Sequence, residues 1–155
     1  MHAQSSNILL FGASGSGSAS GSATGTGTVM IYGVGTDVVE VSRIAKALER
    51  FGDGFAKKIL SPEEFLVFQK NNLKENFLAK RFAAKEAFAK ALGTGFRGDV
   101  NVKSIVVINN ELGRPDIKLN KNVACLLKEK KIKSCHLSIS DEKNIAAAVV
   151  VLESE

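Results

Sequence analysis

The sequence predicts an α+β fold: a mostly antiparallel sheet packed against helices, one of them long and central. Two observations lead to this prediction. Residues 30–92 read mainly as helices after one short strand, whereas residues 104–152 read mainly as strands around a single helix. Short turns join the strand patterns in the second half, as in antiparallel hairpins.

Before these elements comes a leader that we expect to lie outside the fold. Residues 1–28 contain no Lys, Arg, Asp or Glu, and residues 12–28 are almost entirely Gly, Ser, Ala and Thr. Such a segment has little to bury and much backbone freedom to lose. Its apolar run at 8–11 is too short for a membrane span. We interpret residues 1–29 as a flexible expression tag and residues 30–155 as a single domain.

The folded part begins with a strand pattern at residues 30–35 (MIYGVG). Helical spacing of apolar residues follows and ends at Gly52. Asp37, with Glu40 three residues later, fits the start of that helix as a capping box, although Asp replaces the usual Ser or Thr. We therefore expect a strand, a turn at Asp37 and a helix up to Gly52.

Two more helices are expected before the chain changes character. Ser61 followed by Pro62 provides a cap and a first helical residue, so a helix should begin there after a short apolar and basic piece at 55–60. The strongest element is Lys74–Leu92, which is rich in Ala, Leu, Phe, Lys and Glu and ends at Gly93.

The last third of the chain predicts two antiparallel strand pairs separated by a helix. NELGRP separates the first two strands and DEKN the last two, and both are typical turn sequences. The expected elements are strands at 104–109 and 116–119, a helix at 120–131, and strands at 135–140 and 145–152.

Composition narrows the class of function. The chain has a net charge of +5, which favours an acidic partner such as a phosphorylated ligand or an acidic protein. Nucleic acid is a weaker interpretation, because aromatic residues do not alternate with the basic ones. Cys125 and Cys135 form no metal or redox motif, so we expect reduced thiols in a cytoplasmic protein without a membrane span.

Glu86 is the most informative residue of the long helix. At 100° per residue it shares its side of the helix with Ala79, Phe82, Ala83 and Lys90, while the opposite side carries the main core stripe. The stripe consists of Phe77, Ala84, Phe88 and Ala91. A solvent face would carry more charge, so Glu86 and Lys90 need partners. From this pattern alone, an i,i+4 surface ion pair between them is the simpler interpretation.

Three other features each allow two interpretations. Asp37 follows a glycine-flanked strand end, where it can cap a helix or approach a ligand. His136, Ser138 and Ser140 share one face of a strand, which is either a wet face or part of a site. Arg43, Lys46 and Arg50 share a helix face. These three either form a solvated surface or dock an acidic partner.

Taken together, these segments resemble one family. GVGTDVVEVSRI (Gly33–Ile44) and FLAKRFAAKEAFAKALGTG (Phe77–Gly95) look like the two signature blocks of the holo-acyl-carrier-protein synthases, the small bacterial phosphopantetheinyl transferases. NELGRP (Asn110–Pro115) and HLSIS (His136–Ser140) match two further blocks in the expected order. The resemblance covers essentially residues 30–153 and implies the 4'-phosphopantetheinyl transferase fold.

The resemblance also implies a reaction. A phosphopantetheine group would pass from coenzyme A to a serine of an acidic apo acyl carrier protein, releasing adenosine 3',5'-bisphosphate. The family depends on Mg²⁺, supports fatty acid biosynthesis and forms homotrimers with active sites between subunits.

Individual residues follow from the matched motifs. Asp37 and Glu86 match the family's magnesium ligands, and Glu86 and Lys90 would be catalytic. Asp37, Lys90 and three residues of the second block would bind the coenzyme; the three are Arg81, Lys85 and Gly93. Arg43 matches a basic residue on the helix that docks the carrier protein, and Lys46 and Arg50 extend that face.

One position departs from the family pattern. The third block often ends in histidine, whereas this chain has Asp141. A carboxylate repels phosphate unless a cation or hydrogen-bond donor intervenes, and Lys143 is a candidate for that cation.

Two other classes of function fit the same residues. One is a Mg²⁺-dependent hydrolase of coenzyme A or nucleotide pyrophosphates, which would turn over without a carrier protein. The other is a non-catalytic trimeric module that binds acidic proteins, which has no reason to bind coenzyme A in a Mg²⁺-dependent manner.

Overall fold

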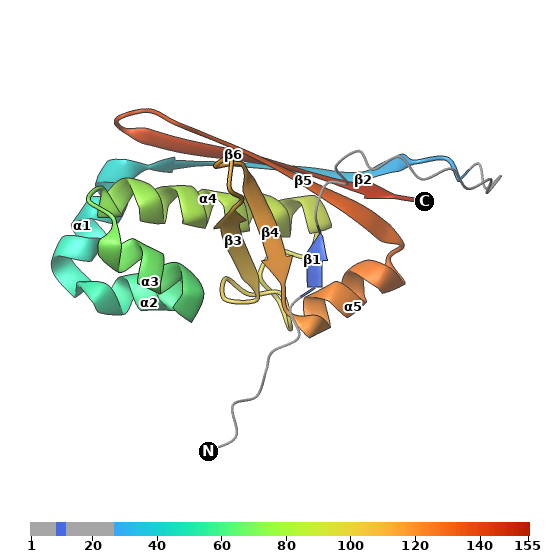
Figure 1. Cartoon of the computed structure of the whole chain (residues 1–155), viewed down its shortest axis with the longest axis horizontal. Coiled ribbons are helices and arrows are strands. Elements are labelled where there is room, and N and C mark those ends of the chain that lie inside the picture. Colours follow the sequence, from blue (N-terminus) through green and yellow to red (C-terminus); the bar gives the residue numbers. More distant parts are fainter. Residues whose placement is uncertain (1–8, 12–26) are drawn as a thin grey trace, which may run out of the picture.

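The computed structural model describes residues 27–155 and the backbone of residues 9–11. Two three-stranded antiparallel sheets, ordered β2-β6-β5 and β1-β4-β3, enclose the long helix α4 (Figure 1). The helices are α1 (Val41–Phe51), α2 (Asp53–Ile59), α3 (Pro62–Lys70), α4 (Lys74–Leu92) and α5 (Lys121–Glu129). The strands are β1 (Leu9–Phe11), β2 (Met30–Glu40), β3 (Ile105–Asn109), β4 (Pro115–Leu119), β5 (Ile132–Asp141) and β6 (Ile145–Ser154). The predicted α+β class with antiparallel sheets and a central helix is confirmed.

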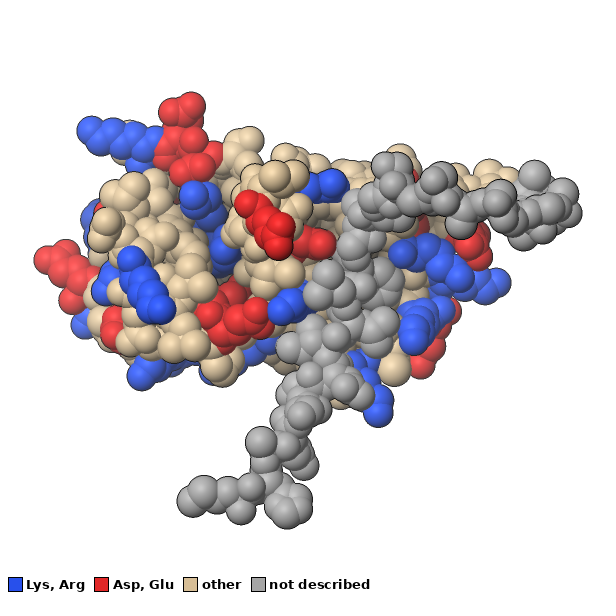
Figure 2. Space-filling view, in the orientation of Figure 1, with Lys and Arg blue, Asp and Glu red and all other residues tan. Residues whose placement is uncertain are grey.

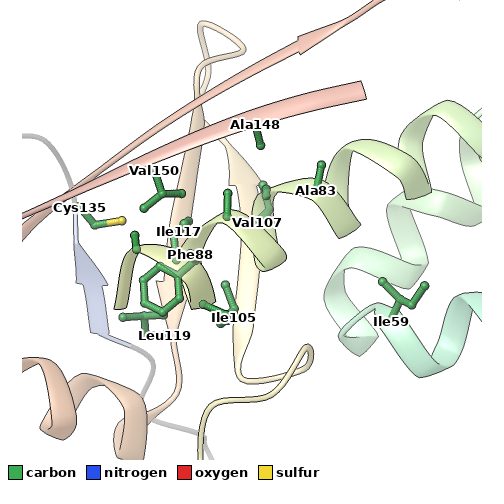
Figure 3. Close-up of a cluster of buried hydrophobic side chains, with 14 of the residues drawn as sticks. Ile59, Ala83, Phe88, Ile105, Val107, Ile117, Leu119, Cys135, Ala148 and Val150 are labelled. Atoms are coloured by element: carbon green, nitrogen blue, oxygen red, sulfur yellow. The ribbon is translucent and has the colours of Figure 1, made fainter. Parts of the chain in front are cut away.

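Helix α4 is buried on most of its circumference, as its all-round apolar composition predicts. Phe88 lies between Val150 of the β2-β6-β5 sheet and Ile105 and Leu119 of the β3–β4 hairpin (Figure 3). The residues of the predicted core stripe are all buried. Gly93 ends the helix in the left-handed conformation, with φ of 79°, as a C-terminal glycine should.

The helix that precedes α4 begins as the sequence predicts. The Ser61 hydroxyl accepts a hydrogen bond from the Glu64 backbone N–H, and Glu64 Oε2 accepts one from the Ser61 backbone N–H. This reciprocal pair is a capping box, and Pro62 occupies the first turn of α3.

The prediction that Asp37 caps the first helix is wrong. Strand β2 continues through Asp37 to Glu40, so α1 starts only at Val41 and has no side-chain cap. Val38 pairs with Ala147 of β6. The VVEV segment suits a pleated strand as well as a helix, and pairing with β6 decides in favour of the strand.

Strand β2 passes unusually close to α4. A Cβ atom on Gly35 would lie 1.9 Å from the carbonyl oxygen of Ala87, and one on Gly33 would lie 2.0 Å from that of Ala91. Any side chain larger than hydrogen would force the strand away from the helix. Gly35 is therefore what lets Asp37, two residues further on the same face, lie against α4.

A short strand within the expected leader was not predicted. Leu9–Phe11 pairs antiparallel with β4, extending the β3–β4 hairpin to three strands. The rest of the leader, residues 1–8 and 12–26, lies outside the described residues. No helix in the described part of the chain is long and apolar enough to cross a membrane.

Candidate active site

A pocket of about 480 Å³ opens where β2, α1, α2 and α4 meet. Its charged lining residues are Asp37, Arg43, Glu86 and Lys90, and its apolar walls include Phe55 and Phe82. Strand β2 contributes Asp37, α1 contributes Arg43, and α4 contributes Glu86 and Lys90. The structure thus gathers into one pocket the residues that the sequence assigns to metal binding, catalysis and the start of the docking face.

Lys90 makes its polar contacts with β2. Its Nζ lies 2.9 Å from Asp37 Oδ1 and donates a second hydrogen bond, also 2.9 Å long, to the backbone oxygen of Thr36. Within the described residues, no ion pair joins Lys90 to Glu86. The local i,i+4 interpretation is therefore replaced by a contact between two distant parts of the chain.

Glu86 lines the same pocket as Asp37, the carboxylate that Lys90 binds. Partial burial raises the pKa of the Glu86 carboxyl, the negative charge of Asp37 raises it further, and Lys90 acts in the opposite direction. Two carboxylates that repel each other in a partly desolvated pocket are stabilised by a shared cation. Asp37 and Glu86 offer the hard oxygen donors that Mg²⁺ prefers, and Mg²⁺ commonly takes only one or two carboxylates together with waters and substrate phosphates.

The residues predicted to dock the partner lie on the exposed side of α1. Arg43, Lys46 and Arg50 are all exposed, and Arg50 also lies over the ring of Phe51. Arg43 reaches the pocket that holds the carboxylates. On the face shown in Figure 2, basic and acidic side chains are interspersed, and the basic ones form no continuous stripe.

Arg81 lies in a different pocket, of about 340 Å³, which also contains Lys80 and Asp141. Arg81 is 7% exposed and its guanidinium lies over the ring of Phe77, and Nη2 donates a 2.8 Å hydrogen bond to Asn109 Oδ1. Nε has no hydrogen-bond partner among the described residues. Burial lowers the pKa of this guanidinium, whose hydrogen-bond partner in the described part of the chain, Asn109, is neutral.

Asp141 does have a cation beside it. Lys80 Nζ lies 3.4 Å from Asp141 Oδ2, whereas Lys143 makes no ion pair with Asp141 within the described residues. The sequence suggests Lys143 because it is close to Asp141 along the chain. Lys80 is distant along the chain and is close to Asp141 in space because β5 packs on α4.

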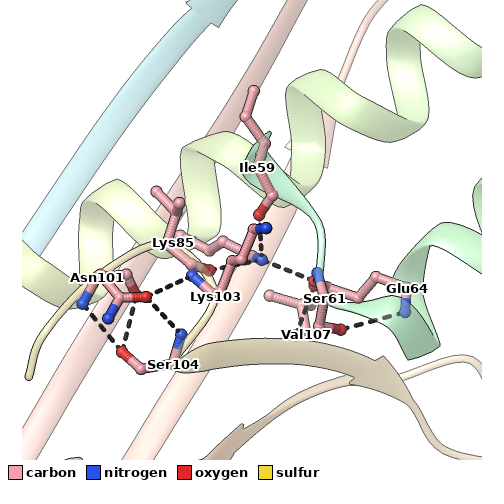
Figure 4. A network of polar contacts seen from close by, with 9 residues as sticks. Ile59, Ser61, Glu64, Lys85, Asn101, Lys103, Ser104 and Val107 are labelled. Atoms are coloured by element: carbon pink, nitrogen blue, oxygen red, sulfur yellow. Dashed lines mark hydrogen bonds and ion pairs between the residues drawn. The ribbon is translucent and has the colours of Figure 1, made fainter. Parts of the chain in front are cut away.

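Lys85 is fully buried and lies in neither pocket. Its Nζ donates to the Ile59 backbone oxygen (2.8 Å), the Val102 backbone oxygen (2.8 Å) and Glu64 Oε2 (2.6 Å) (Figure 4). These contacts use every donor of the ammonium group. Burial lowers the pKa of Lys85, and the Glu64 charge opposes that shift.

Two other predicted features lie away from the carboxylates. Gly93 lines a third pocket, of about 550 Å³, together with Thr94 and Arg97. His136 Nε2 lies 2.8 Å from Glu153 Oε2, which pairs β5 with β6. Sequence reasoning missed Phe55, which lines the pocket of Asp37 and Glu86, because no local pattern distinguishes it from a core residue.

Comparison with known proteins gives consistent matches. Residues 33–150 match the family model described as the 4'-phosphopantetheinyl transferase superfamily. A holo-[acyl-carrier-protein] synthase of Nitrosospira multiformis is 49% identical over 124 residues, 80% of this chain and 99% of that protein.

Solved structures agree with the sequence matches. The holo-[acyl-carrier-protein] synthase of Neisseria meningitidis is 46% identical, with a TM-score of 0.78 over 81% of this chain and 100% of that one. A synthase of Bacillus anthracis, solved in complex with CoA (3',5'-ADP), is 38% identical, with a TM-score of 0.68 over 81% of this chain and 99% of that one.

Proposed function

Since the chain belongs to the 4'-phosphopantetheinyl transferase superfamily, we propose that Asp37, Glu86 and Lys90 form its reaction centre. The chain transfers the 4'-phosphopantetheine group from coenzyme A to an acyl carrier protein. The observation that carries the proposal is the meeting of two carboxylates and one ammonium group in a single pocket.

We further propose that Asp37 and Glu86 hold Mg²⁺. The fit rests on their shared pocket and on the charge of Asp37, which raises the pKa of Glu86. When bound, Mg²⁺ would neutralise charge on the phosphate oxygens. Asp37 and Glu86 then act as ligands from two separate elements, β2 and α4, whose spacing is fixed by the glycine contacts.

In the proposed reaction, the serine hydroxyl oxygen of the carrier bonds to the β-phosphorus of coenzyme A while its O–H bond breaks, and the Glu86 carboxylate accepts the proton. The bond from that phosphorus to the bridging oxygen breaks, and adenosine 3',5'-bisphosphate leaves. Lys90, on its flexible stem at the pocket wall, would neutralise charge on the leaving phosphate. Phe55 and Phe82 restrict water around the reacting atoms.

The predicted coenzyme-binding residues outside the reaction centre have different proposed roles. We propose that Arg81 binds an anionic part of coenzyme A, because among the described residues its Nε has no hydrogen-bond partner and its guanidinium makes no ion pair. Gly93 lines a separate pocket, which would take another part of the coenzyme. Lys85 has all its donors engaged inside the protein, so its proposed contribution is to hold α4 in place.

We propose that the acidic carrier protein docks on the exposed α1 face formed by Arg43, Lys46 and Arg50. Arg43 belongs both to this face and to the active-site pocket. A carrier bound there would therefore present its serine next to Asp37 and Glu86, and opposite charge would speed the encounter.

We propose that the enzyme is a homotrimer with active sites between subunits. Val34 and Val38 of β2 and Val149 of β6 are exposed on the outer face of the sheet, and such an apolar face commonly packs against another copy. A cytoplasmic location and a role in fatty acid biosynthesis complete the proposal, as the family resemblance implies.

The deciding experiment is a transfer assay read by mass. The protein is incubated with coenzyme A, Mg²⁺ and apo acyl carrier protein, and the carrier is weighed by mass spectrometry. The proposal predicts a mass gain of one phosphopantetheine group, abolished by EDTA and restored by excess Mg²⁺. Consumption of coenzyme A without a carrier would instead indicate a hydrolase. Multi-angle light scattering gives the mass of the assembly.

A further inference from the structure

We propose that Lys90 is an internal counter-ion of Asp37, which a divalent cation must displace in order to bind. This inference rests on the proposed metal site at Asp37 and Glu86. Lys90 then acts before the reaction, because its ammonium group neutralises the Asp37 carboxylate in the metal-free protein. A metal that binds Asp37 would release this ammonium group into the pocket.

The contacts of Lys90 are directed at β2. Its ammonium group places one donor on Asp37 Oδ1 and another on the backbone oxygen of Thr36, each at 2.9 Å. The Asp37 side chain is 16% exposed and that of Lys90 is 52% exposed. The carboxylate is thus held in the protein wall, while the lysine stem lies at the pocket surface and is free to move.

A divalent cation and the Lys90 ammonium group compete for the same carboxylate. Both carry positive charge, and Mg²⁺ requires oxygen ligands at short distance and fixed geometry. Two cations on one partly desolvated carboxylate repel each other strongly. Because Asp37 is anchored in β2 and Lys90 sits on a flexible stem, the lysine is the group that leaves.

Once released from Asp37, the Lys90 ammonium group needs a new negatively charged partner in this pocket. Glu86 is the other acidic lining residue, and the metal would occupy it as well. An anionic substrate would then attract the freed Lys90. Metal binding therefore strengthens anion binding through Lys90, and by reciprocity the anion strengthens metal binding.

Arg43 provides a matched control. It carries the same charge and lines the same pocket, but within the described residues it makes no ion pair with Asp37. Replacing either residue with Met removes one positive charge. Only replacement of Lys90 also removes a direct competitor.

The first test measures metal binding without any substrate. Mn²⁺ is titrated into wild type, K90M, R43M and D37N, and free Mn²⁺ is followed by electron paramagnetic resonance. We expect K90M to bind Mn²⁺ at least fivefold more tightly than wild type, and R43M less than twofold. Equal or weaker binding by K90M, or equal gains in K90M and R43M, would overturn the inference.

The D37N arm separates this inference from the proposed function. If wild type binds Mn²⁺ and D37N loses it while K90M behaves as wild type, the metal site stands and only the counter-ion role is wrong. If D37N binds Mn²⁺ as wild type does, both proposals fail.

The second test follows the lysine itself. In ¹⁵N-labelled protein at low temperature, the hydrogen-bonded Lys90 ammonium group should give a side-chain NMR signal that is absent from K90M. We expect Mg²⁺ to remove or shift this signal. A signal that stays unchanged at saturating Mg²⁺ would show that Lys90 remains on Asp37, which contradicts displacement.

Discussion

Oε2 of Glu64 lies 2.6 Å from Nζ of Lys85, and both side chains are essentially excluded from solvent. Glu64 Oε1 also accepts a 2.9 Å hydrogen bond from the backbone N–H of Val107. This pair therefore ties α3 to α4 and to β3, next to the turn of α4 that carries Glu86 (Figure 4).

Lys85→Met should destabilise the fold by about 3–5 kcal/mol, because it leaves Glu64 as a buried charge without its cation. The measurement is the free energy of unfolding in urea. Lys80→Met is the matched control on the same helix. Its ion pair with Asp141 is partly exposed, so its loss should cost only about 0–1 kcal/mol. Similar losses in both variants would contradict the buried-pair argument.

Glu86→Gln should abolish nearly all transfer of phosphopantetheine while the fold persists. Its effect on stability follows from the sign of the pKa shift. Burial, and then Asp37, raise the pKa of Glu86 above its ordinary 4.5, so just above that pH the folded state retains more protons than the unfolded state. Stability of the wild type then falls as pH rises through this window.

Metal-free E86Q should therefore melt no lower than wild type at neutral pH, and should lack the decline on raising the pH. Melting temperatures across pH 4–8, together with the transfer assay, check both statements. Full transfer activity in E86Q would remove Glu86 from the reaction centre.

Gly35→Ala should destabilise the protein and reduce transfer together. The new Cβ would meet the backbone of Ala87 at 1.9 Å and that of Ala91 at 2.5 Å. Overpacking of this kind typically costs about 1–3 kcal/mol or more. Gly54→Ala is the control, since a Cβ there meets nothing within 4 Å. The free energy of unfolding in urea and the transfer activity should both be lower in Gly35→Ala than in Gly54→Ala. Equal stability of the two variants would show that β2 can shift without an energetic cost.

The two thiols should differ sharply in reactivity. Cys125 is exposed and Cys135 is buried. Burial, with a smaller effect from Asp116, raises the pKa of the Cys135 thiol to about 12, so it is protonated at neutral pH. A thiol reagent counted by mass spectrometry should add once to the native protein and twice in denaturant. Rapid double addition to the native protein would contradict the burial of β5.

The elements of the fold that depend on local sequence could be predicted. Helix α4 has the predicted bounds, Lys74–Leu92, because its composition and its terminal Gly93 act within a few residues. The Ser61 cap is local in the same sense. The end of β2 is not local: Val38 fits either a helix or a strand, and only its partner on β6 decides.

The same distinction applies to the site. The sequence predicts Asp37, Glu86 and Lys90 as site residues, but i,i+4 spacing pairs Lys90 with Glu86, which is the wrong partner. Its contact with Asp37 joins positions 53 residues apart, which no local pattern contains. Lys80 beside Asp141 was missed for the same reason.

The close passage of β2 over α4 has a consequence for the length of this segment. Two residues of a strand advance about 6.7 Å, and four residues of a helix advance about 6 Å, so the step from Gly33 to Gly35 keeps pace with the step from Ala91 to Ala87. One more strand step brings Asp37 to the next turn of the helix. Inserting one residue between Gly35 and Asp37 would turn the carboxylate to the opposite face of the sheet. Outside Gly33 and Gly35, the segment can therefore change its side chains more easily than its length.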